Sequence, residues 1–261
     1  MHKSTATSFG SVIKLGGLLL VIGLSIITDA RPNYLRGVMN RGNGLEANDR
    51  SNVHEPDGGN AVGLTILLTG FLLSPTDYQT TIDLLLSKKQ TVISIAITNA
   101  GDDTAIHVRD TVDAYLASNP DKPHSYNLVG HSAGGKIALV LAGETDKLRV
   151  GKVIALDPVD DNEPRFTNTD PERNIDLDGA KADIYMTYTD GGTGIGPENN
   201  AIAIHGANPT TTVYRDVNSS HMCYCDDGGS AIARLSRMFY RPKRGDDEAF
   251  AHAQEWVRTL I

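Results

Sequence analysis

The sequence predicts a doubly wound α/β domain with a mostly parallel sheet, and three observations support this fold class. After residue 60, short apolar runs rich in β-branched residues alternate with longer stretches of helical period. The length of 261 residues suits one domain preceded by a leader. Hydrophobic residues make up 40% of the chain and charged residues 21%, as in an ordinary globular protein.

Six of the apolar runs are predicted to be buried parallel strands, because they are short and almost continuously apolar. They span residues 62–68, 91–97, 126–129, 152–156, 184–188 and 211–217. Helices are predicted at residues 76–87, 103–117, 133–142, 230–239 and 247–260. No paired strands are predicted before residue 62, so the antiparallel N-terminal edge that is usual in such sheets is expected to be shortened or missing.

The amino terminus predicts a cleavable signal peptide at residues 1–30. Lys3 and Lys14 precede an apolar run of about 13 residues, which is shorter than the roughly 20 residues that a spanning helix needs. An uncleaved membrane anchor is the alternative. Residues 31–60 are rich in Asn, Gly, Asp and Arg, and are expected to form a flexible linker or transit-like segment. The folded domain is then residues 61–261, and the chain is expected to enter the secretory pathway.

Charge and cysteine content exclude several classes of partner. The net charge of -8 and the pI near 5.4 would repel phosphate backbones, so no nucleic-acid partner is expected. Cys223 and Cys225, separated by one residue, are too few for a disulfide framework or a tetrahedral zinc site. The sequence therefore predicts neither a metal nor a protein-bound cofactor.

A nucleophile motif is centred on Ser132, in the sequence Gly130-His131-Ser132-Ala133-Gly134. The predicted strand before it and the predicted helix after it give the context of a nucleophile elbow, the sharp strand-to-helix turn of the α/β-hydrolase fold. Glycines at the flanking positions leave room for the two backbones to approach closely. A chance match to Gly-x-Ser-x-Gly is the alternative, and the flanking pattern argues against it. We therefore expect the α/β-hydrolase fold, with Ser132 as the nucleophile.

A serine hydroxyl needs a histidine base, and in this fold the base follows the acid in the chain. His221 comes in the turn directly after the last predicted strand, where a loop can bring it over the serine. His252 lies within a predicted amphipathic helix, and His205 lies in a loop of uncertain structure. His221 is therefore the predicted base.

The acid has two candidates, and each follows a predicted strand at its carboxyl end, where α/β sheets place their sites. Asp157 ends the strand at residues 152–156, and Asp190 comes just after the strand at residues 184–188. Periodicity does not choose between them. The usual position of the acid in this fold, on the strand nearer the histidine loop, favours Asp190 slightly.

An oxyanion hole needs two backbone N–H donors. Ala133 supplies one by its position after the nucleophile. The second is expected from the turn after the first predicted strand, where Phe71 is the predicted donor and Leu72 the alternative. The apolar run from Phe71 to Leu73 would also give a hydrophobic substrate site its wall, or would instead pack on the core.

Four stretches of the chain, spread over residues 59–229, together resemble chlorophyllase, the esterase that removes phytol from chlorophyll. They are Leu68-Thr69-Gly70-Phe71-Leu72-Leu73 with Tyr78; Gly130 to Lys136; Ala155-Leu156-Asp157-Pro158-Val159-Asp160; and Tyr214-Arg215-Asp216-Val217 leading to His221-Met222 and Asp226-Asp227. The last two are specific to that family, whereas many hydrolases share the first two.

The resemblance implies a triad of Ser132, Asp157 and His221, and so favours Asp157 over Asp190. It implies hydrolysis of the phytyl ester of chlorophyll to chlorophyllide and phytol through an acyl-enzyme, without a cofactor. It also implies a plastid location reached through the endoplasmic reticulum, with secretion as the alternative, and peripheral association with a membrane. Leu72, Leu73 and Tyr78 are the expected substrate contacts.

The chain departs from the family pattern at Thr69, where the family usually has His, and at Ala133, where it usually has Arg. The cysteines that the family carries near its carboxyl end are mostly absent. The oxyanion donors are backbone groups, so these differences affect the expected substrate rather than the triad. A general lipase or cutinase-like carboxylesterase acting on other hydrophobic esters is the alternative, and a binding protein that has lost activity is a third hypothesis.

Overall fold

The computed structural model describes residues 51–123, 125–144, 149–160, 164–166, 168, 174–189, 200–216, 219–226, 230, 233 and 246–261. All of them lie in the second of two units, Met1–Arg50 and Ser51–Ile261. The predicted signal peptide and most of the predicted linker lie outside the described residues. So does the helix predicted at residues 230–239, apart from residues 230 and 233.

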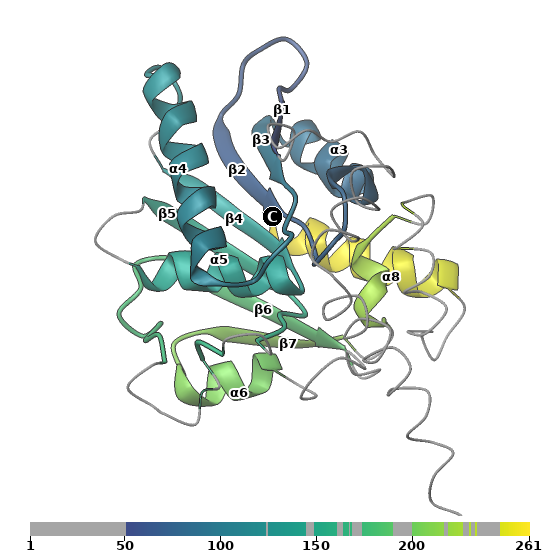
Figure 1. Ribbon diagram of the computed structural model, residues 1–261. Helices are drawn as coiled ribbons and strands as arrows, with labels where there is room; N and C mark the ends of the chain where they lie inside the picture. Colours follow the sequence, from purple (N-terminus) through teal and green to yellow (C-terminus); the bar gives the residue numbers. More distant parts are fainter. Residues whose placement is uncertain are drawn as a thin grey trace, which may run out of the picture. The chain divides into compact units, whose positions relative to one another are not determined.

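The described chain forms a seven-stranded sheet of order β1-β3-β2-β4-β5-β6-β7 (Figure 1). Its strands are β1 (Ser51–His54), β2 (Gly63–Leu68), β3 (Gln90–Ile95), β4 (Tyr126–His131), β5 (Val150–Leu156), β6 (Asp183–Thr189) and β7 (Thr212–Asp216). Strands β2 to β7 are parallel. All six predicted strands are confirmed, with each end within two residues, because their continuous apolar runs match a sheet that is covered on both faces.

The antiparallel edge strand β1 lies inside the segment predicted to be a linker, and this prediction was wrong for residues 51–54. The edge is nevertheless short, as expected for this sheet. Strand β1 pairs antiparallel with β3, with Ser51 opposite Ile95 and His54 opposite Val92. Asn52 and Val53 are exposed. An edge strand needs neither an apolar run nor a clean alternation, so its four residues carry no strand signal of their own.

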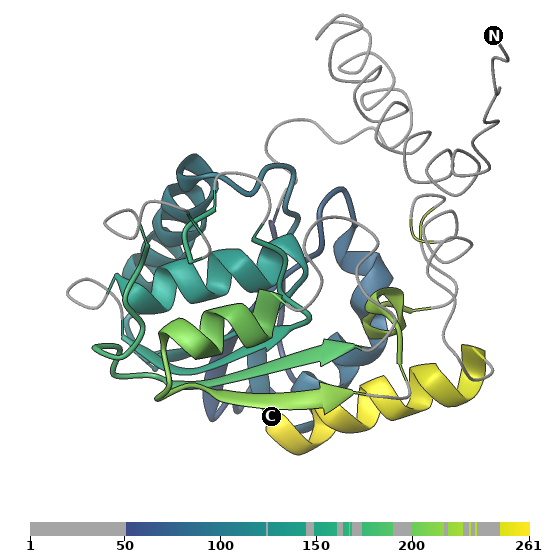
Figure 2. The ribbon, with the colours of Figure 1, turned by 90° about the horizontal axis from the view of Figure 1, so that it is seen from below.

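Helices cover both faces of the sheet. They are α3 (Gln79–Ser87), α4 (Asp102–Ser118), α5 (Ala133–Gly143), α6 (Asn200–Ala207) and α8 (Asp246–Leu260), with short 3-10 helices η1 (Pro75–Tyr78) and η3 (His221–Tyr224). One core cluster contains residues of α4, α5 and α6, and the other contains residues of α3, η3 and α8. Figure 2 shows α5 and α6 on one side of the strands and α8 on the other.

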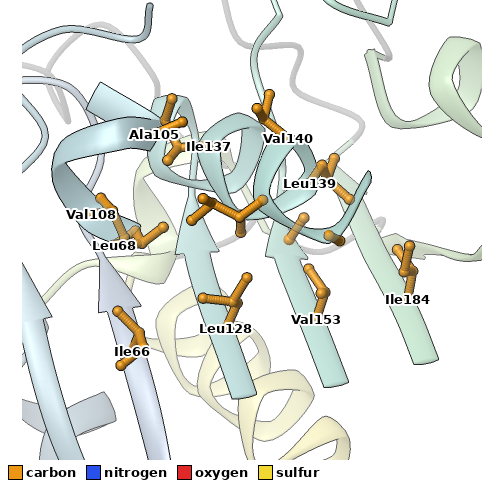
Figure 3. Close-up of a cluster of buried hydrophobic side chains, with 14 of the residues drawn as sticks. Ile66, Leu68, Ala105, Val108, Leu128, Ile137, Leu139, Val140, Val153 and Ile184 are labelled. Atoms are coloured by element: carbon orange, nitrogen blue, oxygen red, sulfur yellow. The ribbon is translucent and has the colours of Figure 1, made fainter. Parts of the chain in front are cut away.

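The core under α5 is formed by side chains of neighbouring parallel strands and of the helix that covers them. In Figure 3, Ile66, Leu128 and Val153 project from three parallel strands toward α5, and all three are fully buried. Because α5 begins directly after Ser132, this packing fixes the turn at Ser132 at the centre of the sheet.

Helix α6 was not predicted, and it carries His205, which had been placed in a loop of uncertain structure. Its sequence Asn-Ala-Ile-Ala-Ile-His-Gly-Ala lacks a clear 3.6-residue period and contains Gly206, a poor helix former. Within the described residues, no helix has the length and apolar character that crossing a membrane requires.

Candidate active site

Ser132 occupies a sharp turn between β4, which ends at His131, and α5, which begins at Ala133. Its backbone has φ 55° and ψ -120°, a conformation that a residue with a side chain rarely adopts. The Ser132 N–H donates to the Leu156 carbonyl at 3.0 Å, and its own carbonyl accepts from Lys136 and Val159. Bonds to two elements thus hold the strained residue in place, and its side chain is only half-buried.

Two glycines allow this turn. A Cβ atom built on Gly130 would lie closer than 3.0 Å to the backbone of Gly134, and one built on Gly134 would collide with the carbonyls of Leu68 and Thr69. Neither position could accommodate a side chain without a shift of backbone. The start of α5 therefore lies directly against the end of β2, where the predicted oxyanion loop begins.

Asp157 follows β5 and also has a positive φ, 46°, which aspartate tolerates better than most residues. Since His131 and Leu156 are paired in register, Ser132 and Asp157 leave neighbouring strands side by side. The Asp157 amide donates to the Thr187 carbonyl at 3.1 Å. The Thr189 hydroxyl donates to Asp157 Oδ2 at 3.0 Å. Neither threonine was predicted; their position at the end of β6, beside a strand that ends in an acid, is the signal that could have identified them.

His221 is the first residue of η3, and its Nδ1 lies 2.8 Å from Asp157 Oδ2. Both side chains are buried, with 5% of the His221 side chain and 7% of the Asp157 side chain exposed. A carboxylate only accepts, so Nδ1 carries the donated proton, and Nε2 of the neutral ring is left as the basic nitrogen. The structure thus brings His221 to Asp157, whereas Asp190 lies outside the described residues. His252 lies on α8 and pairs with Asp216.

The Thr69 hydroxyl fixes the conformation of the loop after β2. The Ile97 N–H donates to the Thr69 hydroxyl at 3.0 Å, and that hydroxyl donates to the Leu73 carbonyl at 3.0 Å. The Leu72 N–H donates to the Ile97 carbonyl at 3.0 Å, so it is not available to an oxyanion. Among the described residues, no acceptor pairs with the N–H of Phe71 or of Ala133. Phe71 is therefore the better candidate of the two loop donors.

The side chains of this loop divide between the surface and the core. Phe71 is 43% exposed and Leu72 is half-buried, so both can face a ligand. Leu73 is 5% exposed and Tyr78 is 1% exposed, and both belong to the core cluster under α3. The structure therefore places Leu73 and Tyr78, which were predicted to contact the substrate, in the core rather than at the surface of the site.

A buried ion pair joins α5, which follows Ser132, to the loop that follows Asp157. Lys136 Nζ of α5 lies 3.5 Å from Asp160 Oδ1, and both side chains are at most 1% exposed. Asp160 also accepts from the backbone N–H of Arg165 and of Phe166, each at 2.9 Å. The segments after β4 and after β5 are therefore held together on the side of α5 as well as through the sheet.

We expect Lys136→Met to destabilise the protein by about 3 to 5 kcal/mol, because it leaves the Asp160 carboxylate buried without its cation. The free energy of unfolding in urea measures the effect. Arg258→Met is the matched control, since the Arg258–Glu255 pair is more than 60% exposed on both sides and such pairs contribute about 1 kcal/mol or less. Equal losses in the two variants would contradict the structural role of the buried pair.

Comparisons with known proteins agree with this architecture. No family model matches the chain, and no curated protein matches it in sequence. The esterase domain of a Rhodothermus marinus protein superimposes with a TM-score of 0.53 at 16% identity, covering 80% of this chain and 92% of that one. A protein of unknown function from Staphylococcus aureus subsp. aureus Mu50 superimposes with the same TM-score at 14% identity, covering 80% and 94%.

Identities this low establish a fold and nothing finer. The two superpositions, together with the mostly parallel sheet, the helices on both faces and the strand-turn-helix at Ser132, show that the chain has the α/β-hydrolase fold.

Proposed function

We propose that this protein is a serine hydrolase that cleaves carboxylic esters through an acyl-enzyme. The observation that carries the proposal is the buried His221–Asp157 hydrogen bond of 2.8 Å beside the strained elbow at Ser132. In this arrangement a nucleophile, a base and the acid that orients the base come from the segments after β4, β7 and β5, all at the carboxyl ends of parallel strands.

The reaction follows from these positions. Ser132 Oγ attacks the ester carbonyl carbon while His221 Nε2 takes the hydroxyl proton, and Asp157 stabilises the imidazolium that forms. The negative oxygen of the tetrahedral intermediate accepts from the N–H groups of Phe71 and Ala133. Collapse of the intermediate breaks the bond to the alcohol, which leaves with the proton from His221. Water then attacks the acyl group by the same steps and regenerates Ser132.

For the substrate, we propose a hydrophobic ester, and specifically the phytyl ester of chlorophyll. Phe71, 43% exposed on the oxyanion loop, and the half-buried Leu72 beside it supply apolar surface at the site. The resemblance of the segments around Asp157 and His221 to chlorophyllase supports the choice of ester. Thr69 and Ala133, which depart from that family, favour the second candidate, a general carboxylesterase acting on other hydrophobic esters.

Hydrolysis of chlorophyll a and of p-nitrophenyl butyrate by the same purified protein distinguishes the two candidates. Release of chlorophyllide supports the chlorophyllase-like assignment. Cleavage of p-nitrophenyl butyrate without release of chlorophyllide supports a general carboxylesterase and excludes chlorophyll as the substrate. Cleavage of neither ester would contradict the proposed function. Both assays include Ser132→Ala to exclude contaminating hydrolases.

A further inference from the structure

A chain of buried hydrogen bonds connects the loop after β2, the end of β4 before Ser132, and the turn that carries His221. The Gly70 N–H lies 2.8 Å from the Tyr78 hydroxyl oxygen, and that oxygen lies 2.7 Å from His131 Nδ1. His131 Nε2 lies 2.8 Å from the carbonyl oxygen of His221. Tyr78 and His131 are each 1% exposed. The chain therefore runs from the oxyanion loop, through the residue before the nucleophile, to the backbone of the proposed base.

The chemistry of the groups assigns a direction to each of these hydrogen bonds. The His221 carbonyl only accepts, so His131 Nε2 carries a proton and donates it. Burial, and then the neighbouring His221, lower the pKa of His131 well below its usual range, which favours the neutral ring with Nδ1 as an acceptor. Cys225 Sγ also lies 3.6 Å from this nitrogen. The Tyr78 hydroxyl therefore donates to Nδ1 and accepts from Gly70. Each polar atom along the chain has a partner of the required kind.

We propose that Tyr78 and His131 are positioning residues, which fix the positions of the oxyanion loop and of the base relative to Ser132. Gly70 directly precedes Phe71, whose N–H is the loop's candidate oxyanion donor. His131 directly precedes Ser132, and its bond is to the carbonyl of His221 itself. Each link therefore ends within one residue of a group that touches the reacting atoms, and this role rests on the function proposed above.

The packing around the chain is tight enough to transmit such a constraint. A Cβ atom built on Gly70 would lie 2.9 Å from Leu73 Cδ1, 3.1 Å from His131 Nδ1 and 3.2 Å from the Tyr78 oxygen. The rings of His131 and His221 are 4.7 Å apart between centroids. Cys225 Sγ lies 3.5 Å from the Tyr78 oxygen, a longer and weaker contact than the bond from Tyr78 to His131. A change at Tyr78 therefore reaches the oxyanion loop and the base together.

The test is Tyr78→Phe, which keeps the ring and removes only the hydroxyl. Tyr126→Phe is the matched control, since Tyr126 is a 4% exposed tyrosine at the opposite end of β4. Active sites are counted with a fluorophosphonate, and kcat per labelled site and KM are measured on p-nitrophenyl butyrate. We expect Tyr78→Phe to lower kcat per site by roughly 10- to 100-fold with KM within about twofold of wild type, because small misplacements of reacting groups have effects of this size. Tyr126→Phe is expected to match wild type.

Two results would overturn the positioning role. One is a kcat per site for Tyr78→Phe within twofold of the control. The other is a loss of labelled sites at unchanged kcat per site, which is what a purely structural role would produce.

Histidine ¹⁵N NMR of the wild-type full chain gives an answer even where a variant fails to fold. We expect His131 to be neutral at pH 7 with its proton on Nε2, and a proton on Nδ1 would contradict the proposed chain. Failure of this inference is separable from failure of the proposed function. If the wild type cleaves no ester, the proposed function and the positioning role are both wrong. If it cleaves esters and Tyr78→Phe matches the control, only the positioning role is wrong.

Discussion

Replacing Ser132 with alanine is expected to lower kcat for ester hydrolysis by roughly 10⁴-fold or more while leaving the free energy of unfolding near that of wild type. The hydroxyl is the only group that can form the acyl-enzyme in the proposed reaction. Alanine can take the same backbone position with no larger a side chain, so the elbow held by the Leu156, Lys136 and Val159 bonds should persist. Initial rates on p-nitrophenyl butyrate and urea unfolding measure the two quantities.

Ser118→Ala is the control for this substitution, because Ser118 ends α4 and its hydroxyl bonds only within its own helix in the described structure. It should hydrolyse the ester at the wild-type rate. If Ser132→Ala retained more than about a tenth of wild-type kcat, another residue would have to be the nucleophile. If it failed to fold, the rate would be uninformative, and the unfolding measurement detects that case directly.

Asp157→Asn is expected to lower kcat by roughly 10⁴-fold, again with the fold intact. Asparagine fits the same space, but it removes the negative charge that stabilises the His221 imidazolium. Its amide can also present a donor to Nδ1, which would shift the ring proton to Nε2 and remove the base. The Thr187 bond to the residue 157 amide does not depend on the side chain, so the backbone should keep its position.

Asp190→Asn is the matched comparison, because sequence reasoning alone favoured Asp190 slightly as the acid. We expect this variant to keep most of the wild-type kcat. The reverse pattern, with Asp157→Asn near normal and Asp190→Asn severely impaired, would move the acid to Asp190 and contradict the role assigned to the His221–Asp157 bond. The kcat values of the two variants are measured on the same ester and at the same pH.

The parts of the fold that could be predicted are those with a local signal. The six parallel strands are apolar runs because both faces of the sheet are covered, and Ser132 lies in a motif whose glycines are required by the close approach of α5 to β4 and β2. His221 was predicted as the base from its place in the turn after β7, and the structure places it beside Asp157. In each case, residues adjacent in the sequence carry the structural requirement.

What could not be predicted depends on contacts between distant residues. Asp157 and Asp190 each follow a predicted strand, and contacts with His221 and with Thr189 on the neighbouring strand are what the structure shows for Asp157. Strand β1 exists only because β3 offers it an edge. The buried Tyr78 hydroxyl is hydrogen-bonded to His131, 53 positions away in the sequence. No window of sequence contains both partners of any of these contacts.

The measurement that tests the central claim most directly is labelling of the wild-type protein with a fluorophosphonate, followed by peptide mapping of the adduct. This probe reacts with serine nucleophiles that are activated by a histidine base, so it needs no knowledge of the natural ester. We predict a single adduct on Ser132, with Asp157→Asn labelled far more slowly. No adduct, or an adduct on a different serine, would contradict the claim that this protein is a serine hydrolase built around Ser132.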